Sequence, residues 1–161
     1  MLFFKKKHMP LIYWFTGQPG SGKTTLCEQV KLGFKNGTII HIDGDDLRDI
    51  FQNKDYSESG RRKNIERAQD IAQFMLAKGY DVLVSLVSPY KDQRESFKTK
   101  CNIIEIYVHT VSDRGRTQYH VAEYEPPTEK FIDIDTTNSN VMDSYEELLN
   151  KIIDFKDNQY E

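Results

Sequence analysis

The sequence Gly17-Gln18-Pro19-Gly20-Ser21-Gly22-Lys23-Thr24 fills every fixed position of the phosphate-binding pattern G-x-x-x-x-G-K-[ST]. Glycines let the backbone curl so that successive N–H groups converge on phosphate oxygens. The pattern requires a strand before it and a helix after it. A continuous apolar run, Leu11–Phe15, precedes it, and a helical stretch runs from Lys23 to about Phe34. We therefore expect a nucleotide-binding loop rather than a glycine-rich turn without a ligand.

Each position of this phosphate-binding loop has an expected role. The Lys23 side chain should reach the β- and γ-phosphates of ATP, and the Thr24 hydroxyl should bind Mg²⁺. The helix that starts at Lys23 adds the positive end of its dipole. The residues expected to bind ATP are Gly17, Gln18, Pro19, Gly20, Ser21, Gly22, Lys23, Thr24 and Thr25.

The flanking sequence predicts one α/β domain over residues 1–161. Strand and helix patterns alternate, which favours a mainly parallel, five-stranded sheet with helices on both faces. The longest helix, 61–78, carries an apolar stripe that Gly79 ends. The last helix should begin at Ser144, with Glu147 at capping-box spacing, and bury Leu148, Leu149, Ile152 and Ile153. The expected strands are 11–15, 38–42, 81–87, 103–108 and 131–134, and a short helix is expected near 46–51.

Composition excludes several classes of protein. Lys and Arg number 22 against 25 Asp and Glu, so nucleic-acid binding through bulk positive charge is not expected. No apolar stretch approaches the ~20 residues that span a bilayer, so a membrane partner is not expected either. Two cysteines, Cys27 and Cys101, favour a cytoplasmic protein without a disulfide scaffold. Cys27 should pack in the core, as should Trp14 and His41. Residues 1–9 are interpreted as a flexible N-terminal extension.

An acidic cluster, Asp43-Gly44-Asp45-Asp46, favours a kinase among nucleotide-binding proteins. A carboxylate at the end of a parallel strand faces the ligand crevice, where it can orient Mg²⁺ or accept a proton from an attacking hydroxyl. The GTPase pattern N-K-x-D is absent, because Asn53-Lys54-Asp55 lacks the spacer. The third strand leads into Ser85-Leu86-Val87-Ser88 without the acidic pair of motor ATPases. The alternative for the cluster is a turn followed by a helix cap.

Four segments then follow in a fixed order: HIDGDDLR (41–48), YSESGRRKNIER (56–67), SLVSPY (85–90) and IEIYV (104–108). The first three resemble the D-G-D-N-[VL]-R, F-S-x-x-D-R-x-E-N-I-R-R and [SA]-F-I-S-P-Y motifs of adenylylsulfate (APS) kinases. The fourth resembles the strand that follows these motifs in the family. The resemblance covers about Leu11 to Val108, and Tyr124-Glu125-Pro126-Pro127 is similar to the family's tail.

The resemblance implies a three-layer P-loop kinase fold that moves the γ-phosphoryl of ATP to the 3′-hydroxyl of adenylylsulfate. The products would be 3′-phosphoadenylylsulfate and ADP, with Mg²⁺ as cofactor. Asp45 fits the carboxylate nearest the acceptor hydroxyl, and Asp43 supports it. Ser88 falls where the family is often given a phosphoserine intermediate, although in-line transfer needs no covalent step. The small nucleotide-like anionic acceptor would contact Arg48, Tyr56, Arg61, Asn64 and Ser88, with the Tyr56 ring stacked on adenine.

Taken singly, these acceptor residues have plainer interpretations. Arg48 and Arg61 would be solvated helix charges, Tyr56 an aromatic at the rim, and Ser88 a helix cap before Pro89.

Two departures from the family concern the acceptor side. Gly60, Lys63 and Glu66 replace the Asp, Glu and Arg of the second motif. The family's lid, an R-D-x-K-G-L-Y stretch after the fourth strand, is missing. We expect residues 111–130, here called the lid segment, to form a shorter cover in which Arg114 and Arg116 stabilise transition-state charge. A solvated surface turn is the alternative.

Three functions remain open from the sequence. The first is an APS kinase, the second a related small-molecule kinase acting on another nucleotide-like hydroxyl, and the third a nucleotide-binding module without turnover. Asp43 and Asp45 favour the first two over the third, and the missing lid favours the second over the first. ATP and the acceptor are the expected partners, and a homodimer is an open option.

Overall fold

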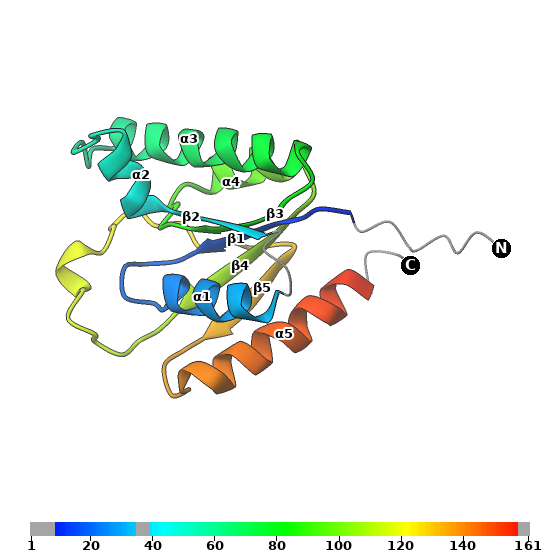
Figure 1. Ribbon diagram of the computed structural model, residues 1–161. Helices are drawn as coiled ribbons and strands as arrows, with labels where there is room; N and C mark the ends of the chain where they lie inside the picture. The colour runs from blue at the N-terminus through cyan, green and yellow to red at the C-terminus, as the bar shows by residue number, and fades with distance from the viewer. Residues whose placement is uncertain (1–8, 35–38, 158–161) are drawn as a thin grey trace.

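A five-stranded parallel sheet lies at the centre of the chain, whose computed structural model describes residues 9–34 and 39–157 (Figure 1). The strand order is β2-β3-β1-β4-β5, and all four neighbouring pairs are parallel. This confirms the predicted α/β class and the sheet. The strands are β1 (Ile12–Thr16), β2 (Ile39–Asp43), β3 (Asp81–Ser85), β4 (Ile103–His109) and β5 (Phe131–Asp135).

The central strand β1 explains why residues 11–15 are apolar without alternation. It pairs with β3 on one side and β4 on the other, with Phe15 opposite both Ser85 and Ile106. All five of its residues are buried, so both of its faces need apolar or satisfied side chains. The strands β2 and β3 lie on one side of β1, and β4 and β5 lie on the other, so the chain crosses over β1 after β3. In sheets of this kind, ligands bind at such a switch point, outside the carboxyl ends of the strands.

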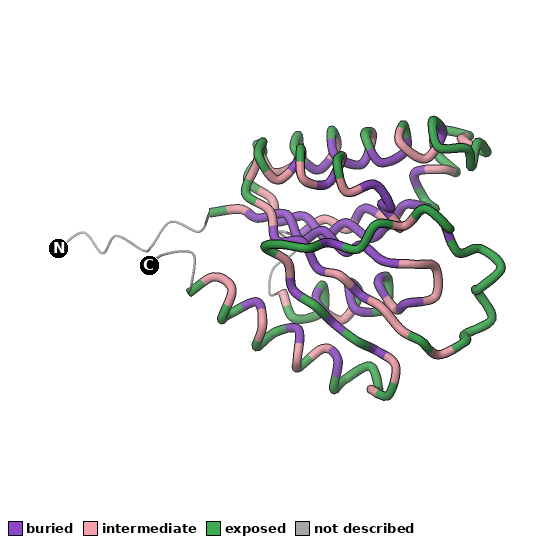
Figure 2. The backbone as a smooth tube through the Cα atoms, turned by 180° about the vertical axis from the view of Figure 1, so that it is seen from behind, coloured by how far each residue is buried: buried purple, intermediate pink, exposed green. Residues whose placement is uncertain are grey.

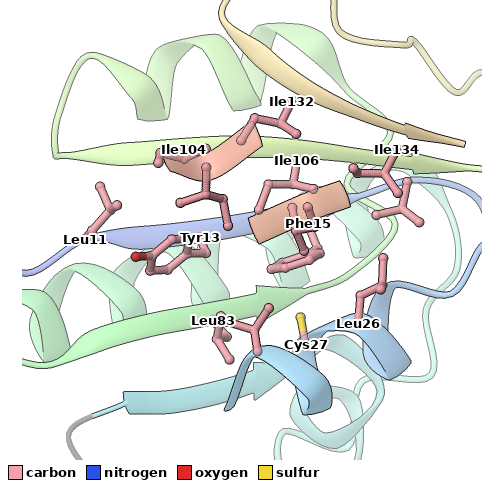
Figure 3. Packing of buried hydrophobic residues seen from close by; sticks show 14 of the residues in the cluster. Leu11, Tyr13, Phe15, Leu26, Cys27, Leu83, Ile104, Ile106, Ile132 and Ile134 are labelled. Carbon is pink, nitrogen blue, oxygen red and sulfur yellow. The ribbon is translucent and has the colours of Figure 1, made fainter. Parts of the chain in front are cut away.

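Two helical layers cover the sheet, as Figure 1 shows. On one face lie α1 (Lys23–Gly33) and α5 (Val141–Asp157), and on the other α2 (Gly44–Ile50), α3 (Glu58–Ala77) and α4 (Lys91–Lys98). Figure 2 shows the buried residues concentrated in the sheet between these layers. Each layer has its own core, and Figure 3 shows the cluster between the sheet, α1 and α5, which includes Tyr13, Phe15, Leu26, Leu83, Ile104, Ile106 and Ile134.

The predicted helix ends are partly confirmed. In α3, Ile65, Ala68 and Ala72 are buried as the stripe predicts, and Gly79 has the positive φ of 92° that favours glycine after a helix. The capping box at Ser144 was wrong. The last helix begins at Val141, where Asn140 Oδ1 accepts from the Asp143 N–H at 3.0 Å.

Two other expectations differ from the structure. Leu148 and Ile152 are buried, but Leu149 and Ile153 remain 36% and 57% exposed because only one side of α5 meets the sheet. The helix α4 was not predicted, since its sequence KDQRESFK has no apolar stripe. None of the helices described is long and apolar enough to cross a membrane. Of the expected extension 1–9, only Met9 falls within the described residues.

Candidate active site

The phosphate-binding loop joins β1 to α1 at the switch point of the sheet. Gly17, Gly20 and Gly22 all have positive φ, at 147°, 82° and 104°. A Cβ at Gly17 would also collide with the carbonyl oxygen of Val108 on β4. Glycine is therefore required here both by the backbone conformation and by the packing of the loop on the sheet.

Lys23 begins α1 with its side chain buried beneath this loop. Its Nζ donates to the carbonyl of Gln18 at 2.8 Å. Burial lowers the pKa of Lys23 to about 8, and the carboxylates of Asp43 and Asp45 oppose that shift. Burial makes this lysine costly to charge, and contact with a phosphate would give the charged form a strong partner.

Asp43 is the last residue of β2 and caps α2. Its Oδ1 accepts from the Asp45 N–H at 2.9 Å. Its Oδ2 accepts from Thr24 Oγ1 at 3.0 Å and from Ser85 Oγ at 2.8 Å. Partial burial alone would raise the pKa of Asp43, but these hydrogen bonds from Ser85, Asp45 and Thr24 hold it below its usual value. An ionised carboxylate thus lies against the threonine that the loop pattern assigns to Mg²⁺.

The chemistry of this pair fits a magnesium ion. Within the described residues no group of three or more His, Cys, Asp or Glu could hold a metal by itself. Mg²⁺ usually takes only one or two protein oxygens and fills its remaining positions with water and substrate phosphates. The hydroxyl of Thr24 and the carboxylate of Asp43 are oxygen donors of that kind.

Asp45 lies two residues after Asp43, in the first turn of α2. Its side chain is exposed, and in the described part of the chain its carboxylate has no hydrogen-bond or ion-pair partner. It nevertheless lies near enough to Lys23 to favour the charged ammonium. This carboxylate is free to meet a substrate, whereas Asp43 is fixed by its own neighbours.

The acceptor residues expected from the sequence fall into two groups. Arg48 and Tyr56 are brought together, with the guanidinium carbon 4.2 Å from the ring centroid. One nitrogen of Arg48 donates to the carbonyls of Asn53 and Asp55, at 3.1 and 2.9 Å. Arg61 is half-buried in the first turn of α3. The structure therefore joins Arg48 to Tyr56 and leaves Arg61 separate from that pair.

Asn64 and Ser88 form the second group, and both are buried. Asn64 Nδ2 donates to the carbonyl of Gly44 at 3.2 Å, which ties α3 to α2. Asn64 Oδ1 and Ser88 Oγ are buried without a hydrogen-bond partner among the residues described. Such atoms need an explanation, and a bound group is one that satisfies them.

Sequence reasoning missed Arg94, which lies on the unpredicted helix α4. Its Nε donates to Glu105 at 2.7 Å, and each of these side chains is only 1% exposed. Its other nitrogens donate to the carbonyls of Ser88 and Glu125. One buried guanidinium therefore holds the turn after β3 and the start of the tail. The available signal was Glu105, a charged residue within a buried strand that requires a partner.

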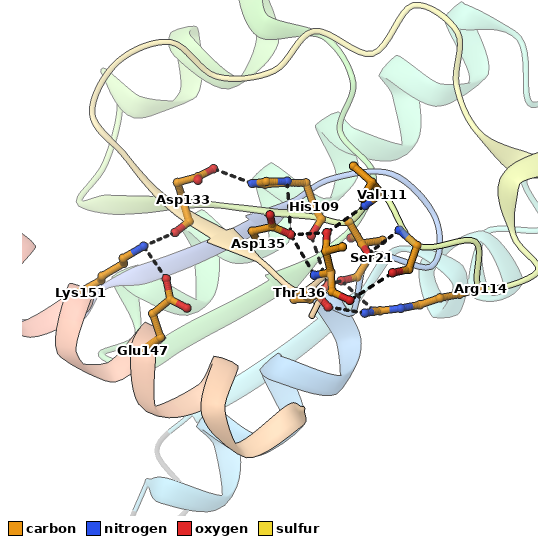
Figure 4. A network of polar contacts seen from close by, with 12 residues as sticks. Ser21, His109, Val111, Arg114, Asp133, Asp135, Thr136, Glu147 and Lys151 are labelled. Atoms are coloured by element: carbon orange, nitrogen blue, oxygen red, sulfur yellow. Dashed lines mark hydrogen bonds and ion pairs between the residues drawn. The ribbon is translucent and has the colours of Figure 1, made fainter. Parts of the chain in front are cut away.

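The lid segment is attached to the phosphate-binding loop at two places. Arg114 donates to the carbonyls of Gly20 and Thr136, at 3.3 and 2.6 Å (Figure 4). The Gln18 amide both donates to the carbonyl of Val121 and accepts from its N–H, at 2.8 and 2.9 Å. Arg116 is exposed between these points. The segment thus passes beside the loop, with Arg114 bound to backbone and Arg116 open to solvent.

Comparison with known proteins agrees with this geometry. A family model described as adenylylsulphate kinase matches residues 9–130. The chain belongs to the adenylylsulphate kinase family. This confirms the resemblance drawn from the four motifs.

Relatives in this family differ in how much of their length they share with the chain. The adenylyl-sulfate kinase of Buchnera aphidicola is 36% identical over 112 residues, which are 66% of this chain and 54% of the relative. The chain thus spans about half the length of curated relatives of this kind. The adenylyl-sulfate kinase of Prochlorococcus marinus is 30% identical in an alignment 174 positions long, gaps included, which covers 93% of this chain and 87% of that protein.

The fold is also that of a solved family member. A Mycobacterium tuberculosis APS kinase in complex with AMPPNP and APS matches with a TM-score of 0.71 at 19% identity. The match covers 88% of this chain and 96% of that one. The arrangement of layers around the phosphate-binding loop is therefore shared with a P-loop kinase.

Proposed function

We propose that this chain transfers the γ-phosphoryl of ATP to the 3′-hydroxyl of adenylylsulfate, giving 3′-phosphoadenylylsulfate and ADP. One observation carries the proposal beyond family membership. A free carboxylate, Asp45, stands beside a fixed one, Asp43, at the strand end that faces the phosphate-binding loop. A carboxylate without partners, such as Asp45, can accept a proton from the acceptor hydroxyl. A carboxylate held by its neighbours, such as Asp43, can bind the metal ion of ATP.

The residues of the loop and of β2 then divide the work on ATP. The loop N–H groups and Lys23 bind the phosphates, and Lys23 carries its proton once it contacts them. Thr24 and Asp43 would hold Mg²⁺, which when bound neutralises charge on the phosphate oxygens. Asp45 orients the acceptor hydroxyl and takes its proton.

The acceptor would bind on the α2–α3 side of the crevice. The Tyr56 ring, with Arg48 on one face, offers the other face for stacking of adenine. Asn64 Oδ1 and Ser88 Oγ, buried without partners among the described residues, would hydrogen-bond to the nucleotide. Arg61 would supply positive charge for the anionic acceptor. Ser88 needs no covalent role in this scheme, since the transfer is direct.

A second candidate is a kinase that uses another nucleotide-like hydroxyl. It is favoured by Arg48, which commits a nitrogen to the carbonyls of its own loop and so has fewer donors for a doubly charged acceptor. We place either reaction in the cytoplasm, where the free thiols Cys27 and Cys101 stay reduced.

An acceptor screen distinguishes these functions. ADP release from ATP and Mg²⁺ is measured with adenylylsulfate, AMP, CMP and plain sugars. The proposal predicts the highest kcat/KM with adenylylsulfate and phosphate on its 3′-oxygen. A faster reaction with another hydroxyl would establish the second candidate. ATP binding without transfer to any acceptor would leave a nucleotide-binding module.

A further inference from the structure

A chain of four side chains leads from the surface of α1 to the metal-binding aspartate. His41 lies on β2 two residues before Asp43, so both side chains project toward the α1 face of the sheet. The Nδ1 of His41 lies 2.9 Å from Glu28 Oε1, and its Nε2 lies 2.8 Å from Ser85 Oγ. Ser85, on β3, donates to Asp43 Oδ2 at 2.8 Å.

Counting donors and acceptors fixes the direction of these bonds. Asp43 is an ionised carboxylate and only accepts, so the single proton of the Ser85 hydroxyl points to it. The Ser85 oxygen then offers only lone pairs to the imidazole, and Nε2 must donate to it. His41 Nδ1 lies within hydrogen-bond distance of Glu28 Oε1, and this contact holds the ring in place. Ser85 thus accepts from His41 Nε2 and donates to Asp43 Oδ2.

Burial makes this arrangement specific. The His41 side chain is 8% exposed and Ser85 is 2% exposed, while Glu28 is half exposed at the surface of α1. The expectation that His41 belongs to the core was right about burial. A purely structural core position there would be met by an apolar side chain, without two satisfied ring nitrogens.

We propose that His41 is a positioning residue for phosphoryl transfer. Held by Glu28, it fixes the hydroxyl of Ser85, which in turn keeps the Asp43 carboxylate turned toward Thr24. Without His41 the Ser85 hydroxyl can rotate and donate elsewhere, and Asp43 loses the bond that orders its Oδ2. The inference rests on the proposed transfer to adenylylsulfate, in which Asp43 and Thr24 hold the metal.

The test compares His41→Leu, Ser85→Ala and their double variant with the wild type. Loss of a group that orients a metal-binding carboxylate should reduce kcat by about tenfold to a hundredfold. The KM for adenylylsulfate should stay within about twofold, since the four hydrogen-bonded side chains lie on the α1 face of the sheet, and α3 lies on the other face. The double variant should lose no more than either single one, because the two residues act as one unit. His41→Gln, whose amide can donate to Ser85, should recover most of the rate. His109→Gln, on β4, is the matched histidine control and should keep wild-type kcat.

A second readout does not need turnover. Calorimetry with ADP alone and with ADP plus Mg²⁺ gives the factor by which the metal strengthens binding. That factor should fall in His41→Leu and Ser85→Ala, while ADP binding in EDTA stays at the wild-type level. Thermal unfolding of each variant is measured alongside.

The outcomes separate the two proposals. Variants with lower melting temperature but wild-type kcat and Mg²⁺ factor would overturn the positioning role and leave a structural one. If His41→Leu does not fold, Ser85→Ala and His41→Gln decide the same question. A wild type that does not phosphorylate adenylylsulfate, with the Mg²⁺ factor still dependent on His41, would overturn the proposed function and not the role of His41.

Discussion

At the level of single residues, we expect the protonation of Lys23 to set how nucleotide binding depends on pH. In the unfolded chain this lysine has a pKa of 10.5, and burial lowers it to about 8 in the fold. The folded chain therefore binds fewer protons than the unfolded one between pH 8 and 10.5. Burying the charged lysine therefore lowers the free energy of unfolding. This loss has its full size below pH 8 and disappears as the pH rises toward 10.5.

Nucleotide binding has the opposite dependence on pH. Phosphate contacts require the charged lysine, so binding above pH 8 must also take up a proton. We expect the affinity for ADP to fall by up to about tenfold for each pH unit above 8. Calorimetry from pH 7 to 9.5 checks this. Lys23→Arg stays charged throughout and should give a flat profile, and a flat wild-type profile would contradict the expectation.

The two aspartates should respond differently to the same substitution. Asp45→Asn keeps the shape of a side chain that has no partner in the described structure, and removes the carboxylate that we propose as proton acceptor. Its kcat should drop by roughly 10²–10⁴-fold with little change in the KM for ATP. Asp43→Asn disturbs the bonds to Thr24 and Ser85, so it should raise the KM for ATP and the Mg²⁺ requirement. Steady-state kinetics of both variants test the assignment. A mild Asp45→Asn beside a crippled Asp43→Asn would reverse the two roles.

At the level of segments, the part of the lid segment between Arg114 and Val121 should order when both substrates bind. Most of it is exposed, and in the described structure its hydrogen bonds to the phosphate-binding loop lie near its two ends, at Arg114 and Val121. Hydrogen exchange over residues 111–120 should slow with an ATP analogue and the acceptor together. Arg116→Ala should lower kcat and increase ATP hydrolysis relative to transfer, because water enters a poorer cover. Exchange that stays fast in the ternary complex would argue against a cover.

The helix α4 is held by a pair of buried charges, and its stability should depend on both. Arg94→Met removes one cation paired with the buried Glu105, which keeps its ion pair with Lys98, and should lower the free energy of unfolding by up to about 3–5 kcal/mol. Arg62→Met is the matched control. Arg62 pairs with Asp92 at 3.0 Å, but these side chains are 35% and 68% exposed, so the loss should stay within about 1 kcal/mol. Urea unfolding measures both, and equal losses would show that burial of the Arg94 pair is unimportant.

For the whole molecule, the sequence was sufficient for the sheet and for the phosphate-binding loop. Apolar strands and a glycine pattern are local signals, and Gly17 to Thr24 lie where the pattern places them. The start of α5 was missed because Asn140 and Ser144 are both good caps, and it is Asn140 that accepts a hydrogen bond from the first turn. The helix α4 was missed because its buried face is Arg94 and Phe97. The row of hydrogen bonds from Glu28 through His41 and Ser85 to Asp43 joins α1, β2 and β3. No local sequence pattern shows contacts between elements so far apart in the sequence.

The position of β1 in the middle of the sheet also has a consequence for synthesis of the protein. The Leu11 N–H, at the edge of β1, bonds to Asp81, 70 residues later in the chain. At ~5–20 residues per second, a ribosome needs about 4–14 s to reach that residue, and more to reach β4. During this time a strand whose five residues are all buried in the fold has neither of its neighbours. The nascent chain therefore exposes its most apolar strand for seconds, and that interval is when a chaperone has most to protect.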